Sequence, residues 1–101
     1  MRIYISGPIT GEKRYKEIFE KAERELEARG YKVINPAKMD EVMPDDTTWE
    51  EYMEVSGALL SFADGIYMLE GWEKSKGARM EYEWAKEQGK NIYQQNQERK
   101  E

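Results

Sequence analysis

Near its start the chain carries the decapeptide RIYISGPITG, residues 2–11, in which an apolar run passes directly into a segment rich in glycine and proline. The run Arg2–Ser6 is too short for a secretion signal and has the composition of a buried strand. Gly7, Pro8 and Gly11 then predict a turn. A buried strand that leads through a loop into a helix is the repeating unit of parallel α/β folds.

Three helical patterns follow this strand. The first is predicted for about residues 13–29, with Gly30 as its C-terminal cap. The second starts at two overlapping capping boxes within residues 47–51 and ends at Asp64-Gly65, and the third covers residues 75–88. The apolar stripes of the first two helices are Tyr15, Ile18, Phe19, Ala22 and Leu26, then Trp49, Tyr52, Met53, Leu59, Leu60 and Ala63, with Ser56 on the same face.

Three further apolar runs, at residues 31–34, 66–69 and 91–93, predict strands, while residues 37–46 are expected to be irregular. These strands are short and lack strict alternation, which is typical of a parallel sheet covered on both faces. The order strand, helix, strand through the chain therefore predicts a three-layer α/β/α fold, flavodoxin-like or Rossmann-like, with a parallel sheet of four to five strands.

The composition fits one domain, expected over residues 1–93, followed by a polar tail, residues 94–101, that is frayed or disordered. Of the 101 residues, 39% are hydrophobic and 37% charged, and no apolar run reaches 18 residues. We therefore expect a cytoplasmic protein without a membrane span.

The residue types also limit the chemistry. The chain contains no cysteine and no histidine, which excludes disulfides, imidazole bases and the usual zinc sites. Neither a metal nor an organic cofactor is implied. A net charge of -5 argues against binding to a nucleic acid polymer, because that needs a basic surface.

In open parallel sheets, ligands bind beyond the carboxyl ends of the strands, where the strand order reverses. Three loops are singled out in this way, residues 7–11, 35–46 and 70–76. The amides of the first loop can meet a phosphate or a sugar at a helix end, although a tight turn that needs glycine explains the same residues.

The start of the third helix is more informative. Ser75 stands where an N-cap belongs, Gly77 allows a ligand to approach the first turn, and Glu81 lies on the second turn among apolar neighbours. Burial raises the pKa of such a carboxyl group, while the helix macrodipole favours its ionised form. The alternative is that Glu81 is a solvated helix residue like Glu83 or Glu87.

Four motifs taken together resemble those of the nucleoside 2-deoxyribosyltransferase superfamily, most closely a short uncharacterised branch of phage and bacterial proteins (DUF4406-like). The motifs are IYISGPITG at 3–11, VINP at 33–36, ADGIYML at 63–69 and GWEKSKGARME at 71–81. The resemblance extends to about Tyr93.

The resemblance implies cleavage of an N-glycosidic bond by double displacement, as in a retaining glycosidase. Glu81 matches the family nucleophile, Tyr4 would orient it from the first strand, and Ser75 matches a phosphate or sugar ligand. Simple packing under a helix explains Tyr4 equally well. The other residues assigned to substrate binding are Gly7, Ile9, Thr10, Gly11, Asn35, Ser56 and Gly77.

One position departs from the family pattern. Relatives carry an aspartate eight residues before the position of Asp64, where it helps to protonate the leaving base, and this chain has Ser56 there. Serine is no carboxylic acid, so the protein is slow, uses Asp40, Asp45 or Asp46 instead, or binds without turnover. Asp64 itself is read as a structural residue at the junction of helix and strand.

Three hypotheses follow for the function. The first is an N-glycosidic-bond enzyme that acts on a deoxynucleoside or, preferably, on its 5′-monophosphate, and the second is a nucleotide-binding or sensing module without catalysis. The third is a structural or interaction domain that binds no ligand at the end of the sheet. Trp72 is read as a packing residue rather than a lid over the base, and Arg79 either pairs with phosphate or is solvated. By analogy with relatives we expect a homodimer or higher homo-oligomer, with an apolar patch from either Tyr82 and Trp84 or Trp49 and Tyr52. The alternative is that these residues close a small core.

Overall fold

Four parallel strands form the sheet in the computed structural model, which describes residues 1–95. The strands are β1 (Arg2–Ser6), β2 (Lys32–Ile34), β3 (Gly65–Met68) and β4 (Asn91–Gln94), in the order β2-β1-β3-β4. The order reverses between β1 and β3, as in flavodoxin-like sheets. The predicted α/β class and parallel sheet are confirmed.

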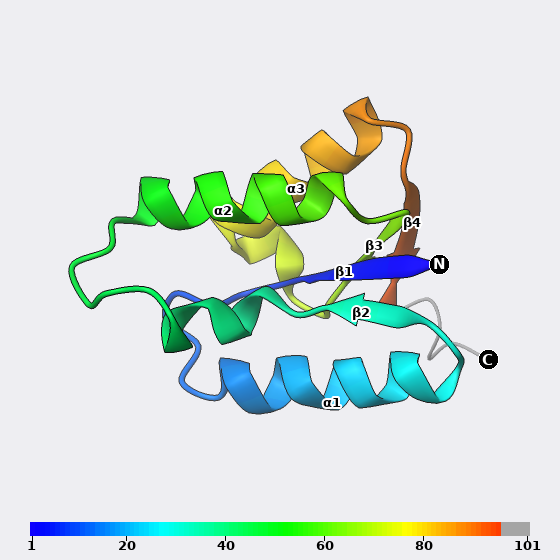
Figure 1. Cartoon of the computed structure of the whole chain (residues 1–101), viewed down its shortest axis with the longest axis horizontal. Coiled ribbons are helices and arrows are strands. Elements are labelled where there is room, and N and C mark those ends of the chain that lie inside the picture. Colours follow the sequence, from blue (N-terminus) through cyan, green and yellow to red (C-terminus); the bar gives the residue numbers. More distant parts are fainter. Residues whose placement is uncertain (96–101) are drawn as a thin grey trace.

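The helices cover both faces of this sheet, which gives the predicted three layers (Figure 1). Helix α1 (Tyr15–Ala28) lies on one face, and α2 (Trp49–Ser61) and α3 (Lys76–Glu87) lie on the other. Two short 3-10 helices, η1 (Pro36–Glu41) and η2 (Trp72–Lys74), lie after β2 and before α3. The starts of α1 and α2 lie near the carboxyl ends of the strands.

The core consists of two apolar clusters, one on each side of the sheet. Alternation along β1 sends Ile3 and Ile5 toward α1, and Tyr4 toward α2 and α3. The buried members beside α1 are Ile3, Ile5, Phe19, Ala22, Leu26, Ala37, Tyr67 and Leu69. Those on the opposite side are Tyr4, Leu60, Ala63, Ile66, Met68, Ala78 and Ala85.

Capping residues act at the helix ends that the sequence marks. Gly30, with φ of 94°, follows α1 in the left-handed region that favours glycine. Of the two capping boxes predicted for α2, the one between Thr48 and Glu51 forms, because the Thr47 hydroxyl donates to the Pro44 carbonyl instead. The helix ends at Ser61, three residues before the predicted stop.

Two other predictions need correction. Ile18, assigned to the buried stripe of α1, is 38% exposed because it lies at the edge of the face that Phe19 and Ala22 bury. Part of the segment expected to be irregular is η1, whose start is capped by the Asn35 side chain.

The predicted boundary between domain and tail also shifts slightly. Gln94 pairs with Met68 and belongs to β4, so the sheet extends one residue into the predicted tail. Gln95, the next residue of that tail, accepts a hydrogen bond from the amide of Glu70 at 2.9 Å. The rest of the predicted frayed or disordered tail, residues 96–101, lies outside the described residues. Within residues 1–95, none of the helices has the length and apolar character needed to cross a membrane.

Candidate active site

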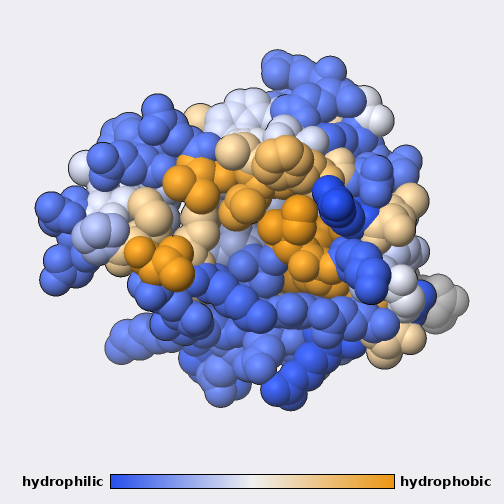
Figure 2. All heavy atoms as spheres, in the orientation of Figure 1, coloured by the Kyte–Doolittle hydropathy of each residue, from blue (hydrophilic) through white to orange (hydrophobic). Residues whose placement is uncertain are grey.

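A cavity of about 640 Å³ lies where β1 ends. The loop after β1, η1, α2 and the first turn of α3 supply its walls. Figure 2 shows the molecule hollowed between α2 and η1, with apolar side chains gathered around the hollow. This is where open parallel sheets bind ligands, beside the reversal of strand order.

Glu81 supplies a buried carboxyl group to the wall of this cavity, and only 6% of the residue is exposed. The Tyr4 hydroxyl donates to Oε2 at 2.7 Å, and the Ser6 hydroxyl donates to Oε1 at 2.6 Å. Such short distances are typical of hydrogen bonds to a charged acceptor. The contact predicted between Tyr4 and Glu81 is present, and each carboxyl oxygen is held by a hydroxyl group of β1.

Ser6 is a site residue that the sequence interpretation missed. Residues at i and i+2 of a strand face the same side, so Tyr4 and Ser6 both point toward α3. Given the prediction that Tyr4 faces Glu81, this alternation was the signal that could have identified Ser6.

Burial and hydrogen bonding act in opposite directions on the pKa of Glu81. Burial is the larger effect and raises this pKa, while hydrogen bonds from Ser6, Tyr4 and Ser56 oppose the rise. Because the effect of the helix macrodipole is concentrated in the first turn, it acts weakly at the second turn, where Glu81 lies. Burial and the negative charge of Glu81 raise the pKa of Tyr4 well above its ordinary value, so Tyr4 keeps the proton that it donates.

Ser56 brings a third hydroxyl group to this cluster. It is 4% exposed, lies on the cavity wall and lowers the pKa of both Tyr4 and Glu81 against the effect of burial. Tyr4, Ser6 and Ser56 therefore surround Glu81 with neutral groups, where an aspartate at position 56 would add a second negative charge.

The start of α3 forms one wall of the cavity, with both residues predicted there. The Ser75 hydroxyl caps the helix by accepting from the amide of Ala78 at 3.2 Å. Gly77 faces α2 so closely that an added Cβ would lie 3.3 Å from the sulfur of Met53. The glycine thus allows α3 to lie close to α2 at this wall, and its predicted role in admitting a ligand stays a prediction.

The loop after β1 lies beside the carboxylate. Gly7, Ile9 and Thr10 line the cavity, and Gly11 is absent from its wall. A Cβ on Gly7 would come within 2.8 Å of the Leu69 side chain, so the close approach of this loop to the end of β3 requires glycine.

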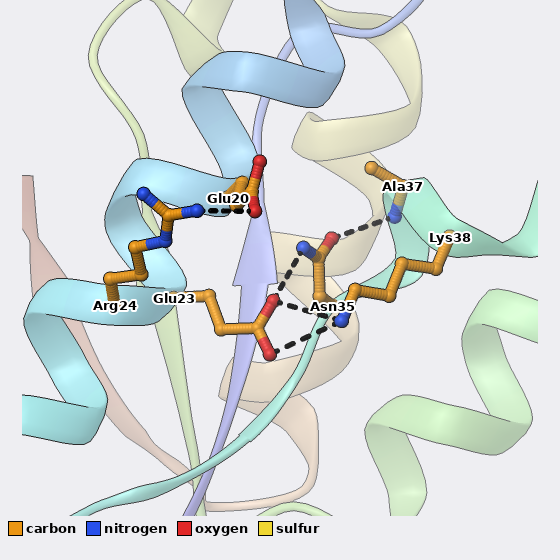
Figure 3. A network of polar contacts seen from close by, with 6 residues as sticks. All are labelled: Glu20, Glu23, Arg24, Asn35, Ala37 and Lys38. Carbon is orange, nitrogen blue, oxygen red and sulfur yellow. Dashed lines mark hydrogen bonds and ion pairs between the residues drawn. The ribbon is translucent and has the colours of Figure 1, made fainter.

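Asn35 lies outside the cavity wall and has a structural role instead. Its Nδ2 donates to Glu23 at 2.9 Å, and its Oδ1 accepts from the amide of Ala37 at 2.9 Å (Figure 3). Lys38 contacts the same Glu23 carboxylate at 3.4 Å. Asn35 therefore fastens the turn between β2 and η1 to α1, with both ends of its amide occupied.

Three other residues weighed from the sequence also have structural contacts. Trp72 stacks on Tyr82, with ring centroids 4.6 Å apart, and stays off the cavity wall. Arg79 donates to the carbonyl of Glu73 at 2.8 Å. Asp64 accepts from the amide of Arg2 at 2.8 Å, in agreement with its predicted role at the junction of helix and strand.

Part of the cavity wall is aromatic. Tyr15 of α1 and Trp49 and Tyr52 of α2 line it together with Asp40 of η1, and the Lys76 ammonium lies 4.6 Å from the centre of the Trp49 ring. The three aromatic residues belong to the apolar stripes that were predicted to be core, since periodicity alone does not separate a core face from a cavity wall. Throughout residues 1–95, no group of three acidic side chains is arranged to hold a metal ion.

Comparison with protein families matches residues 1–94 to the model of a domain of unknown function (DUF4406). No curated protein matches the chain. Because the match includes β1, the loop after it and all of α3, the whole candidate site lies within the family domain. The chain belongs to the DUF4406 family.

Proposed function

We propose that this protein cleaves the N-glycosidic bond of a deoxynucleoside or, preferably, of its 5′-monophosphate, with Glu81 as the nucleophile. The observation that carries the proposal is the buried Glu81 carboxyl group, held at both oxygens on the wall of a cavity of about 640 Å³. Cavities of this size are typical of small-molecule sites. The resemblance to nucleoside 2-deoxyribosyltransferases supplies the reaction type.

In the first step, a carboxylate oxygen of Glu81 forms a bond to C1′ of the sugar. The bond between C1′ and the base nitrogen breaks, its electron pair leaves with the base, and the base takes up a proton from solvent. Tyr4 and Ser6 act as positioning residues, since their hydroxyl groups hold the carboxylate from β1.

In the second step, the glycosyl ester is resolved. Water attacks C1′, the bond to the Glu81 oxygen breaks, and the carboxylate is restored with release of the sugar. A second base in place of water gives transfer instead of hydrolysis. Both outcomes share the first step.

The nucleophile must be ionised, and burial raises the pKa of Glu81. Activity should therefore rise with pH as Glu81 loses its proton. The three neutral hydroxyl groups around the carboxylate favour the ionised form, because each can donate a hydrogen bond to it.

The second candidate function is a nucleotide-binding module without turnover. Ser56 favours it, since the position at which relatives carry an acid holds a buried hydroxyl. Under either function the partner is a small nucleoside or nucleotide, and the resemblance supports a homodimer.

The test is chromatography after incubation of the protein with deoxynucleosides and their 5′-monophosphates. The variant is Glu81→Gln, which keeps the shape but removes the charge. The matched control is Glu83→Gln, an exposed glutamate on the same helix. We expect free base from the parent and the control, and a rate at least roughly a thousandfold lower in Glu81→Gln.

Three results would contradict the enzymatic proposal. Equal base release from Glu81→Gln and the parent would exclude Glu81 as the nucleophile. Thermal stabilisation by monophosphates without base release would favour the binding module. No response to any compound would leave neither function standing.

A further inference from the structure

The cavity wall carries a second carboxylate, Asp40 of η1, which lies beside Tyr15 of α1. Among the described residues that line the cavity, Asp40 and Glu81 are the two acidic ones. Asp45 and Asp46, the other acids considered from the sequence, are exposed and stay off the wall. Asp40 is therefore the carboxylate that a bound substrate can reach besides Glu81.

The two oxygens of Asp40 differ in their contacts. Oδ2 accepts a hydrogen bond from the Tyr15 hydroxyl and lies 3.3 Å from the Lys16 ammonium. Oδ1 is buried and has no hydrogen-bond partner among the described residues. A buried carboxylate oxygen is rarely left unpaired, and this one can be satisfied by an N–H group.

Tyr15 adds a second acceptor beside Asp40. The hydrogen bond to Asp40, together with burial, raises the pKa of Tyr15 to about 12, so the tyrosine stays protonated. Its proton is directed to Asp40, which leaves the phenolic oxygen able to accept but not to donate elsewhere. The pair thus presents acceptors and no donor to a ligand.

Charge determines how a nucleoside monophosphate would lie in this cavity. Lys74 and Lys76 line it at the start of α3, on the side of Ser75 and the loop after β1. A phosphate is attracted to these lysines, whereas Lys16, the cation beside Asp40, is paired with that carboxylate. With the sugar at Glu81, the base then points toward Asp40 and the rings of Tyr15 and Tyr52, which suit a planar base.

We infer that Asp40 and Tyr15 recognise the base and select one with an exocyclic amino group, such as cytosine or adenine, over the carbonyl analogue. This inference rests on the proposed function and names its substrate class. An amino group of the base donates a hydrogen bond to Asp40 or Tyr15. A carbonyl oxygen in the same place is itself an acceptor, so it forms no hydrogen bond with the pair and binds less well. Because Oδ1 is covered, the carboxyl group of Asp40 must turn on η1 to meet the base.

The experiment compares two matched substrate pairs, dCMP with dUMP and dAMP with dIMP, by kcat/KM for base release. Each pair differs in an amino group against a carbonyl oxygen. We expect the parent to prefer the amino member at least roughly tenfold. Asp40→Asn should reduce or reverse this preference, because its amide can donate to a carbonyl, while the exposed control Asp45→Asn should keep it.

Binding gives a readout that does not depend on catalysis. Calorimetric titration of Glu81→Gln with dCMP and dUMP should show the same preference, and addition of Asp40→Asn should remove it. Tyr15→Phe should weaken the preference and keep its direction, since the Asp40 carboxylate remains.

The outcomes separate this inference from the proposed function. Base release from the parent without preference within either pair would overturn the role of Asp40 and leave the proposed reaction standing. The same holds if Asp40→Asn retains the preference of the parent while melting as the parent does. Neither base release nor binding with any of the four compounds would overturn both.

Discussion

On the face of β1 that packs against α1, Ile3 and Ile5 are buried among apolar side chains. On the opposite face, Tyr4 and Ser6 are equally buried, yet their hydroxyl groups hold the carboxyl group of Glu81. The apolar face gains free energy by removing hydrocarbon from water. On the polar face, burial removes the Glu81 carboxylate from water, which is unfavourable for the charged form and raises the pKa of Glu81. The polar face of β1 is therefore less stabilising than the apolar face, and a buried ionisable group kept at such a cost in stability is a candidate for function.

The largest effect on stability is expected on the apolar face. Ile5→Ala removes buried methyl and methylene groups and leaves a cavity, so the free energy of unfolding should fall by about 2–5 kcal/mol. Urea unfolding followed by circular dichroism measures this change. Ile18→Ala is the control, because Ile18 is 38% exposed and should lose less than about 1 kcal/mol. Similar losses in the two variants would mean that this face of β1 is not part of a well-packed core.

Residues of the apolar face were predictable because their pattern repeats along the chain. The run Arg2–Ser6, the stripe of α1 and the stop at Gly30 all follow from local spacing and turn chemistry, and the structure has them where predicted. Ile18 shows the limit, since a residue at the edge of a helical stripe is buried only if the neighbouring layer reaches it.

Much of the site depends on residues far apart in the sequence. Ser6 and Glu81 are 75 positions apart, and no local pattern joins them. The Glu81 assignment came from a motif, whereas the pairing of Asp40 with Tyr15 depends on how η1 packs against α1. Asn35 was misleading because an Asn-Pro motif suits a site loop and a capping turn equally well, and here it caps η1.

The polar face predicts a specific pH dependence of stability. A carboxyl group whose pKa is raised on folding binds a proton more tightly in the folded state. Its contribution to stability is therefore largest at acidic pH and is lost as the pH rises from about 4.5, the ordinary value for glutamate, through the raised pKa of Glu81. Glu81→Gln lacks this ionisation, so the free energy of unfolding of the variant minus that of the parent should increase with pH across this window.

Urea unfolding at a series of pH values from 4 to 8 (roughly) gives this difference directly, because the other carboxylates contribute to both proteins. The exposed Glu83→Gln supplies the control and should show a flat difference. Ser6→Ala removes one donor to the carboxylate and should shift the window to higher pH. A difference for Glu81→Gln that decreases with pH would show that hydrogen bonds outweigh burial at this carboxyl group.

The smallest effect on stability is expected at Gly77. A substitution there is also the most direct test of whether the cavity beside Glu81 binds a ligand. Gly77→Ala adds a Cβ 3.3 Å from the flexible end of Met53, and the gain in helix propensity offsets this crowding. The free energy of unfolding should therefore change by less than about 1 kcal/mol. Gly57→Ala is the matched control, since Gly57 is also helical, its added Cβ would lie 3.4 Å from Trp84, and it stays off the cavity wall.

If the cavity binds a nucleotide, calorimetric titration should show weaker binding to Gly77→Ala alone, because the added methyl group reduces the space in the cavity between α2 and α3. Equal affinity of the two variants would mean that the ligand lies elsewhere.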